Sequence, residues 1–561
     1  MRPLLPLGGV LLAASYLLPS TERPWPSFWR EWVAGCALIV LFAWTFGGQP
    51  GPQRYRVPAA ALLSVSLAVS AWAQLAAGSL NFLSDAVLVS GYLLGFAAAI
   101  VGASNVEAEG RRALIRTLCL VWLAAAVVST PIALLQWLRV LPWEGVLSTD
   151  LPHYGGRPVA QLGQSNMLCL LMLLGLASLL RLYEEDALPA GKLLLLVPLL
   201  TAGAALTQSR LAWVAYGTAP CFWWLLSRRA APRIRTGWFV AAAALFAALS
   251  ALVLSGNYEL GLGGTALAER MSGGRRPDAW RLFLNAVFER PWTGWGWLQT
   301  GNAQISVALQ HPPLAWYFSS SHNQFLDLAL WCGIPIAIGV AGFIVVGGAR
   351  LCTSTSGGTE ASSLLAIVFV LLHAMVEFPL LYGNILWPLG FWLGIHLGKR
   401  GSASSVVHLP GVPFRIGSWL ILPVGAALLG VLARDVRIAQ EIWPTTRIAH
   451  VAERPILYAE PSSPQILLMD SLQAFHDFAA QSQNAALSPE TYARMHSVRN
   501  RYPYPEVLEH YAWVLSRNGG ETEAIHELQL ACRFQSATSC AELLAAWSFW
   551  RGSGNRVPAL P

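Results

Sequence analysis

The run NQFLDLALWCGIPIAIGVAGFIVVGG, residues 323–348, decides the fold of this chain. Beyond a few polar residues at its start it is apolar and long enough to cross a bilayer as a helix, which takes about 20 residues. Similar runs recur along the 561 residues, of which 55% are hydrophobic and 12% are charged. A soluble protein carries about twice that charged fraction. The sequence therefore predicts an all-α, polytopic helical membrane protein.

Hydropathy predicts about thirteen transmembrane helices. Only Arg2 precedes the first of them, and no clear cleavage site follows it, so we interpret this run as a membrane anchor rather than a signal peptide. The predicted spans are residues 3–19, 32–46, 57–78, 86–103, 117–139, 163–180, 193–207, 211–227, 237–254, 323–348, 361–380, 384–398 and 416–433.

Arginine and lysine gather in the loops on one side of these spans, as at Arg111-Arg112 and Arg228-Arg229. The positive-inside rule makes those loops cytoplasmic. The long loop 255–322 and the tail after residue 434 then face outward. The net charge of +7 follows from this topology. Because no basic stripe with interleaved aromatics is present, we expect no nucleic-acid partner.

The composition divides the chain into a transmembrane domain, 1–433, and an outward helical domain, 434–561. Within the tail, five residues around Gly519-Gly520 follow the spacing of a tetratricopeptide-like (TPR-like) helix pair. One such pair cannot bury its face alone, so helices within 436–450 and 464–500 are expected to complete the packing. Cys532 and Cys540 are placed where a disulfide is permitted, and the sequence leaves open whether they form one. The five residues are Ala512, Leu515, Ala524, Leu528 and Ala531.

The outward loop 255–322 is predicted to contain an amphipathic helix over 277–290. Its expected apolar face comprises Trp280, Phe283, Leu284 and Val287, and arginines lie at its start. Such a helix is typical of one that lies on the bilayer surface.

Arginines at three places are predicted on the outer face: Arg157, Arg210 and the pair Arg275-Arg276. Arg210 lies at a helix N-terminus, where the macrodipole disfavours a cation unless an anion is bound beside it. The guanidinium fork suits phosphate oxygens, so three arginines could hold a diphosphate without a metal. The alternative is that Arg210 extends to lipid phosphates.

His322 and Asn323 are predicted at the N-terminus of a helix on the same face. The helix dipole there favours a neutral imidazole, which can act as a general base. One of Ser319, Ser320 and Ser321 could cap this helix, and Asp327 lies one turn below. The alternative is a structural histidine bonded to a carbonyl group. Because no outward carboxylates show metal-ligand spacing, we expect no metal.

His373 and Glu377 lie four residues apart in an apolar run. That spacing predicts a contact between them within the bundle. Pro379 is expected to end their helix, with Tyr382 just beyond. We favour a structural hydrogen-bonded pair over direct catalysis.

Over residues 150–400 the chain resembles the bacterial O-antigen ligase and O-oligosaccharyltransferase superfamily, which implies a GT-C-like glycosyltransferase. Two positions depart from the usual pattern: Ser165 replaces a common proline, and Trp331 stands where a glutamate is common. The residues that carry the resemblance are Arg157 with Gly163-Gln164-Ser165-Asn166, Ser209-Arg210, Arg276-x-x-x-Trp280, Pro291-x-x-Gly294-x-Gly296, His322-Asn323 and His373-x-x-x-Glu377-x-Pro379-Leu380.

The segment around Glu377 and the helical tail look most like the protein-directed, PglL-type branch. The resemblance implies metal-independent, inverting transfer of a glycan from undecaprenyl diphosphate to Ser or Thr of pilin or another periplasmic protein. It implies a multi-pass enzyme of the bacterial inner membrane, with its site and tail in the periplasm, in contact with membrane lipids and without a cofactor. By position, the implied catalytic residues are His322 and Asn323; diphosphate would be bound by Arg157, Arg210, Arg276, Gln164 and Asn166; supporting residues would be Arg275, Trp280, Asp327, His373, Glu377 and Tyr382.

Two alternatives stay open. Ligation of O-antigen to a lipid A core, or glycan polymerisation, would use the same site with a different acceptor, and the tail favours a protein acceptor. A transporter of lipid-linked sugars would show charges at the membrane midplane and two related halves.

Overall fold

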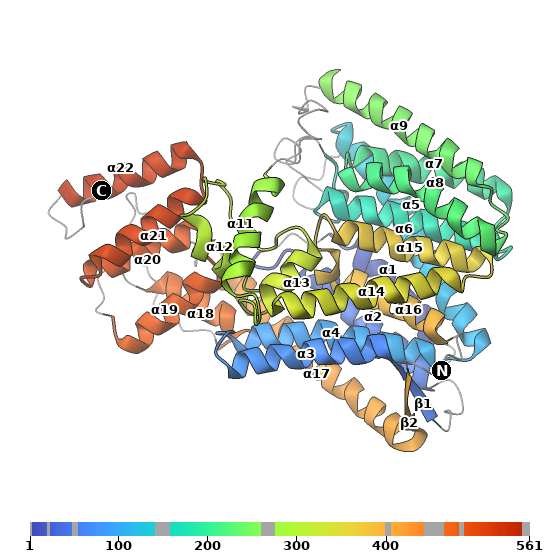
Figure 1. Cartoon of the computed structure of the whole chain (residues 1–561), viewed down its shortest axis with the longest axis horizontal. Helices are drawn as coiled ribbons and strands as arrows, with labels where there is room; N and C mark the ends of the chain where they lie inside the picture. Colours follow the sequence, from blue (N-terminus) through green and yellow to red (C-terminus); the bar gives the residue numbers. More distant parts are fainter. Residues whose placement is uncertain are drawn as a thin grey trace. The chain divides into compact units, whose positions relative to one another are not determined.

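The computed structural model describes residues 3–19, 23–47, 54–140, 157–259, 275–398, 406–442, 465–481 and 487–552. Over these ranges the chain is almost entirely helical, which confirms the all-α class (Figure 1). The elements are α1 Leu4–Leu17, α2 Phe28–Gly47, β1 Arg54–Pro58, α3 Ala59–Ala76, α4 Leu83–Ser104, α5 Ala108–Trp137, α6 Ser165–Glu184, α7 Ala190–Leu206, α8 Arg210–Ala230, α9 Thr236–Glu259, α11 Arg276–Glu289, α12 Thr300–Ala308, α13 Gln324–Cys332, α14 Ile334–Thr353, α15 Gly358–Ala374, η1 Pro379–Leu381, α16 Gly383–Gly398, β2 Val406–Pro410, α17 Gly411–Ile442, α18 Asp470–Ala480, α19 Pro489–Arg501, α20 Pro505–Arg517, α21 Glu521–Arg533 and α22 Ala537–Gly552.

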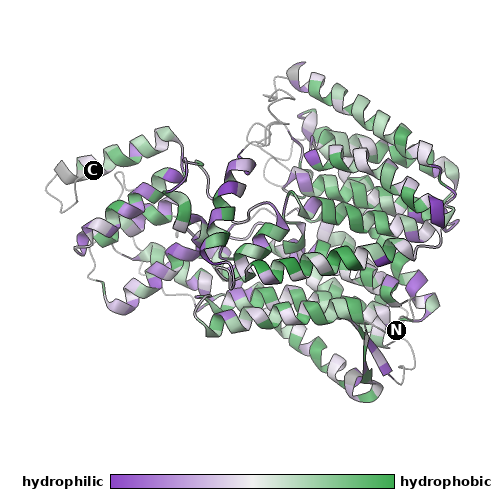
Figure 2. Ribbon diagram, viewed as in Figure 1, coloured by the Kyte–Doolittle hydropathy of each residue, from purple (hydrophilic) through white to green (hydrophobic). Residues whose placement is uncertain are grey.

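Eight helices in the described ranges are long and apolar enough to cross a membrane: α2, α3, α4, α5, α6, α9, α14 and α17. Three shorter apolar helices, α1, α7 and α15, accompany them. Hydrophobic residues cover α4, α9 and α14, whereas α19–α21 alternate hydrophilic and hydrophobic positions (Figure 2). The chain is therefore a multi-pass membrane protein, and the count of thirteen spans stays a prediction.

The run 323–348 forms two helices, so the prediction of one continuous span is wrong. The break falls at Gly333, whose φ is 85°. A Cβ atom at Gly333 would lie 2.4 Å from the carbonyl oxygen of Trp292. The Ile334 N–H donates to the Pro291 carbonyl oxygen at 2.8 Å. Because this packed backbone needs a left-handed glycine, the membrane helix α14 begins at Ile334, and α13 is a separate short helix.

The chain divides into two compact units, which we describe one at a time. Unit 1 comprises residues 1–67, 91–274 and 341–430, and unit 2 comprises 68–90, 275–340 and 431–561. The predicted boundary between 433 and 434 stays a prediction.

In unit 1, α6 lies at the centre and contacts α5, α7, α8 and α15. Nearly every α6 residue from Ser165 to Leu182 is buried, as expected for a helix that is apolar on all sides. A short antiparallel ladder pairs β1 with β2, with Arg54 opposite Pro410. The hydropathy pattern did not predict these strands.

In unit 2, α20 and α21 form the predicted helix pair, with Gly519 in its turn at φ 86°. All five residues of the predicted spacing are buried. The tail helices share their core with Phe82, Ile305 and Ala308, which precede the tail in sequence. The TPR-like label stays a prediction, and residues 443–450 of the expected helix 436–450 lie outside the described residues.

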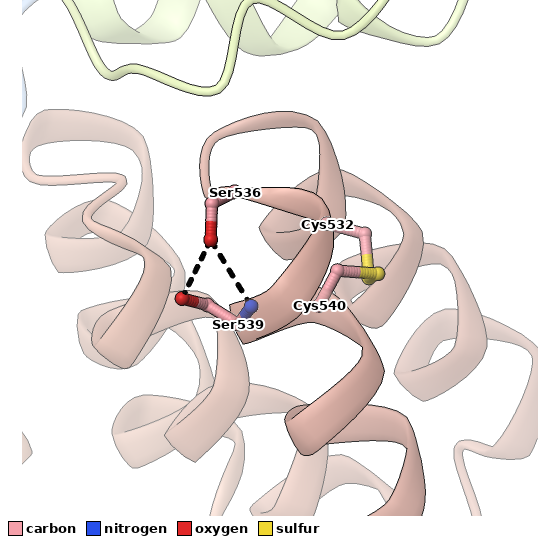
Figure 3. The surroundings of a disulfide bond; sticks show 4 residues. All are labelled: Cys532, Ser536, Ser539 and Cys540. Carbon is pink, nitrogen blue, oxygen red and sulfur yellow. Dashed lines mark hydrogen bonds between the residues drawn. A yellow bond between two sulfur atoms is a disulfide. The ribbon is translucent and has the colours of Figure 1, made fainter.

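Cys532 and Cys540 form a disulfide, with a sulfur–sulfur distance of 1.97 Å. It joins the end of α21 to α22 (Figure 3). Beside it, Ser536 Oγ accepts from the Ser539 N–H at 3.1 Å and so caps the first turn of α22.

The loop helix α11 is present at nearly the predicted bounds, but its predicted face is partly wrong. Phe283 and Val287 are buried, whereas Leu284 is 47% exposed. Ala279, Leu282 and Ala286 complete the buried face, and α11 packs on α12 and α13. The face expected to enter the bilayer is therefore covered by protein, because neighbouring elements of unit 2 supply its apolar partners.

Candidate functional site

The first candidate cluster lies in unit 1 and centres on Asn166. Arg157 Nη2 donates to Asn166 Oδ1 at 2.8 Å, and Ser209 Oγ donates to the same oxygen at 2.8 Å. Asn166 Nδ2 donates to Glu377 Oε1 at 2.6 Å. Because the carboxylate can only accept, it orients the amide so that its oxygen faces Arg157. The structure thus brings together Arg157, Asn166 and Glu377, three residues predicted for the site.

Two helix starts and a hairpin hold this cluster. Asn166 lies in the first turn of α6, two residues after Gln164, which occupies the N-cap position. Arg157 Nε donates to the Thr207 carbonyl oxygen at 2.9 Å, in the hairpin between α7 and α8. Ser209 caps α8 by accepting from the Leu211 N–H at 3.3 Å. Arg210 is the first residue of α8, so this cap places it beside the cluster.

The prediction that Pro379 ends the helix of His373 and Glu377 is wrong, because α15 already ends at Ala374, three residues before Glu377. The Glu377 N–H still donates to the His373 carbonyl oxygen at 2.8 Å. Its side chain is 3% exposed and bonds to Asn166. The side chain of Glu377 therefore links the segment after α15 to the start of α6. Helical spacing did not indicate this contact.

The second candidate cluster lies in unit 2 and holds His322. His322 adopts φ 57°, in the left-handed region, and its N–H donates to Ser320 Oγ at 3.1 Å. Asp327 accepts from Ser320 Oγ at 2.5 Å and from the Ser321 N–H at 2.7 Å. Trp280 Nε1 donates to the Ser321 carbonyl oxygen at 2.8 Å. Three side chains therefore fix the turn that presents the half-buried imidazole.

Asn323, and none of the three preceding serines, caps α13. Its Oδ1 accepts from the N–H groups of Phe325 and Leu326, each at 3.1 Å. The predicted serine cap is wrong because Ser320 and Ser321 bond instead to Asp327 and to their neighbours in the turn. His322 therefore directly precedes the cap and lies near the helix N-terminus, as predicted.

Asp327 is the buried residue whose carboxyl group accepts the hydrogen bonds that hold this turn. It is fully buried, and α13 lies outside the eight candidate spans. Burial raises the pKa of Asp327 from 3.8 to about 6, against the opposing effect of the hydrogen bonds from Ser320 and Ser321.

The remaining predicted arginines are divided between the two units. Arg275 donates to the Ala315 carbonyl oxygen at 3.0 Å, and Arg276 begins α11, both in unit 2. Arg157 and Arg210 belong to unit 1. The convergence of the three arginines with His322 therefore stays a prediction.

Sequence reasoning missed a buried polar group at the start of α2. This helix begins at Phe28, four residues before the predicted span, and thereby includes Arg30 and Glu31, which are 7% and 5% exposed. Glu31 accepts from Ser27 Oγ at 2.5 Å, from the Gly383 N–H at 3.2 Å and from the Tyr92 hydroxyl. Two adjacent ionisable residues at the edge of an apolar run were the available signal.

No three His, Cys, Asp or Glu side chains within the described ranges are grouped to hold a metal ion. Metal independence itself stays a prediction.

Two families match the sequence. Residues 194–344 match the family described as O-antigen ligase. Residues 361–535 match the family described as virulence factor membrane-bound polymerase, C-terminal.

Two curated proteins of Acinetobacter baylyi are similar to most of the chain. A general O-oligosaccharyltransferase is 26% identical over 480 residues, covering 80% of this chain and 81% of that protein. A ComP-specific O-oligosaccharyltransferase is 23% identical over 409 residues, covering 72% of each.

Proposed function

We propose that this chain, which carries an O-antigen ligase domain and is homologous to O-oligosaccharyltransferases, transfers a glycan from undecaprenyl diphosphate to a Ser or Thr hydroxyl of a periplasmic protein such as pilin. The observation that carries the proposal is the similarity to a general O-oligosaccharyltransferase along 80% of the chain.

In this proposal His322 is the general base. Its imidazole takes the proton of the acceptor hydroxyl while the hydroxyl oxygen attacks the anomeric carbon, and the bond from that carbon to the diphosphate breaks. Attack opposite the leaving group inverts the anomeric centre. The bonds from Ser320, Asp327 and Trp280 support this role because they hold the turn in one conformation.

Arg157, Arg210 and Arg276, with Gln164 and Asn166, are proposed to bind the diphosphate and stabilise its departing charge. Arg157 is already oriented by the Thr207 carbonyl and the Asn166 amide. Its guanidinium would therefore lose little side-chain freedom when the phosphate binds. No metal or cofactor is part of this mechanism.

The proposed location is the bacterial inner membrane, and the positive-inside distribution supports an orientation with His322 and the tail in the periplasm. There the tail, 434–561, would dock the protein acceptor.

The left-handed backbone conformation at His322 decides which substitution best tests its role. Asn tolerates φ 57° better than other non-glycine residues, so His322→Asn removes the imidazole and spares the turn. His311→Asn, in the same unit, is the matched control. Cells supplying an undecaprenyl-diphosphate glycan, a pilin and lipid A core would be analysed by mass spectrometry of the pilin and by gel electrophoresis of the lipopolysaccharide.

Glycan on pilin with the wild type and the His311 variant, but not with His322→Asn at equal expression, would support the proposal. Undiminished transfer by His322→Asn would exclude His322 as the general base. The match to a membrane-bound polymerase family favours ligation or polymerisation on a lipid or glycan acceptor as the second candidate, and sugar found only on lipid would select it. No transfer at all would return attention to a transporter of lipid-linked sugars.

A further inference from the structure

One side of α11 exposes large apolar residues, although the opposite side is packed within unit 2. Leu284 and Phe288 are one helical turn apart, and they are 47% and 68% exposed. Trp292, in the turn after the helix, is 78% exposed, the highest value among the large hydrophobic residues of the described ranges. We call Leu284, Phe288 and Trp292 the α11 apolar surface. Large apolar side chains exposed so close together are typical of an interaction surface.

The backbone joins this surface to the start of a membrane helix. The Ile334 N–H donates to the Pro291 carbonyl oxygen at 2.8 Å, and a Cβ at Gly333 would lie 2.4 Å from the Trp292 carbonyl oxygen. Ile334 is the first residue of α14, a candidate membrane span of which 11% is buried inside the protein. Most of α14 is therefore available to lipid, and Trp292 lies where this helix begins. These four residues all belong to unit 2.

The direction and the composition of α11 suit the boundary between lipid and water. Figure 1 shows α11 running across the direction of α14, as a helix that lies on a bilayer surface does. The polar residues Arg281, Asn285 and Glu289 are also exposed on α11 and adjoin the apolar surface. Tryptophan is enriched at membrane–water interfaces. The exposed side of α11 therefore combines an apolar edge for lipid with a polar edge for water.

The packed side of α11 holds the turn that carries His322. Trp280 Nε1 donates to the Ser321 carbonyl oxygen at 2.8 Å. The ring centroid of Phe283 lies 6.1 Å from that of Phe318, and the Phe318 centroid lies 5.8 Å from that of His322. The depth at which α11 lies would therefore set the height of the imidazole relative to the bilayer.

We propose that the α11 apolar surface inserts among the lipids beside the start of α14 and thereby holds the His322 turn at the level of a lipid-linked diphosphate. The docking follows from the contacts within unit 2, whereas its effect on glycan transfer rests on the proposed function. Phe288 and Trp292 act as positioning residues and touch no reacting atom. Lipid is favoured over a protein partner because the surface adjoins a helix whose own sides are open to lipid.

Photo-crosslinking of the full-length protein in phospholipid vesicles tests the docking. The photoreactive residue p-benzoylphenylalanine would replace Phe288, Phe343 of α14 as the lipid-facing reference, or Phe549 of the tail as the control. Phe343 is 38% exposed and Phe549 is 73% exposed. After irradiation, the Phe288 and Phe343 variants should each gain the mass of one phospholipid, and the Phe549 variant should not.

Four results would overturn the docking. A covalent dimer formed through position 288 would show that a second copy occupies the surface, and a crosslink within the chain would show that the protein itself covers it. The absence of any adduct at position 288, or equal lipid labelling at positions 288 and 549, would also contradict it.

A charge at the same position tests the effect on transfer. Phe288→Glu should lower kcat/KM for an undecaprenyl-diphosphate glycan in vesicles about tenfold, because a carboxylate is held out of the lipid. Phe288→Trp should restore the wild-type value. With a short-chain, water-soluble diphosphate donor in detergent, Phe288→Glu should match the wild type, because the depth of the turn no longer matters.

Phe549→Glu is the matched control and should match the wild type with both donors. An equal loss with both donors in Phe288→Glu would mean that the substitution damages the site, and the positioning role would be wrong. If Phe288→Glu fails to fold, the crosslinking alone decides. Absence of transfer by the wild type with either donor would contradict the proposed function, and the crosslinking would still decide the docking.

Discussion

Arg501 at the end of α19 forms a buried ion pair with Asp85 in the first turn of α4, within unit 2. Arg501 Nη2 lies 2.9 Å from Asp85 Oδ1, and the two side chains are 16% and 1% exposed. Gln299 Nε2 donates to the second oxygen of Asp85 at 3.1 Å. The buried ion pair between Arg501 and Asp85 thereby joins the tail to the start of α4.

Replacing Arg501 is expected to be strongly destabilising. Arg501→Met leaves the Asp85 carboxylate buried without its partner, which should lower the free energy of unfolding by about 3–5 kcal/mol. Asp85→Leu combined with Arg501→Met should recover most of the loss. Thermal unfolding of detergent-purified protein would measure both.

Arg494→Met is the control on the same helix. Arg494 is 56% exposed and pairs with Asp477 at 3.3 Å, and such surface pairs contribute at most about 1 kcal/mol. Equal losses for Arg494→Met and Arg501→Met would contradict the role assigned to the buried pair.

A carboxylate from the tail caps α4. Asp470 accepts from the Leu83 N–H at 2.8 Å and the Ser84 N–H at 2.9 Å. Asp470→Ala should therefore lower the free energy of unfolding by about 1 kcal/mol, and Asp470→Asn, which keeps an acceptor oxygen, by less. A loss that is the same for Ala and Asn in thermal unfolding would show that capping is not the cause.

The same contacts affect how the tail can be tested. Deleting residues 440–561 would remove Arg501 and Asp470 together, leaving Asp85 unpaired and α4 uncapped. We expect the truncated protein to lose activity on protein and lipid acceptors alike, measured as glycan transfer at equal expression. Selective loss of protein glycosylation after this deletion would contradict that expectation, and point substitutions on the tail surface are the better probe of acceptor docking.

Hydropathy and spacing predicted much of this structure because they report on local burial. The apolar runs became helices, and Ala512 and Leu528 are buried in the predicted pair. Hydropathy and local spacing do not report contacts between residues that are distant in sequence. Gly333 and Pro335 were local signals of a helix end within the run 323–348, but hydropathy alone favoured one span, and nothing in the run shows that Trp292 packs on Gly333.

Only part of the candidate site was predicted, because the sequence indicates local spacing but not contacts between distant residues. His322 at a helix start follows from local sequence, but the cap was predicted among Ser319, Ser320 and Ser321 and missed Asn323, because the bonds of Ser320 and Ser321 to Asp327 could not be foreseen. The bond between Glu377 and Asn166 spans 211 residues, so helical spacing pointed only to the neighbour His373.

Substituting Gly333, which directly precedes α14, and Gly339, which lies inside it, should have opposite effects on stability. Gly333→Ala places a Cβ 2.4 Å from the Trp292 carbonyl oxygen at φ 85°. Strain and clash together should cost more than about 2 kcal/mol and lower the yield of folded protein. Gly339 lies inside the helix with open space around it, so Gly339→Ala should be neutral or stabilising by up to about 1 kcal/mol. Unfolding of the two variants in detergent measures both effects, and a tolerated Gly333→Ala would contradict the assigned break.

Asp327 should make stability depend on pH. Its pKa is raised from 3.8 to about 6 in the folded protein, so the folded state binds a proton more tightly than the unfolded chain. The free energy of unfolding is then highest below about pH 4 and falls as the pH rises to about 6, by roughly 3 kcal/mol for two pKa units. Asp327→Asn lacks this dependence while keeping an oxygen that can accept from Ser321. Chemical unfolding between pH 4 and 7.5 should therefore show the wild type gaining about 2.4 kcal/mol on the variant as the pH is lowered. Asp278→Asn, at a residue of α11 with a 63% exposed side chain, should run parallel to the wild type, and a parallel curve for Asp327→Asn as well would show that burial does not hold a proton on this carboxyl.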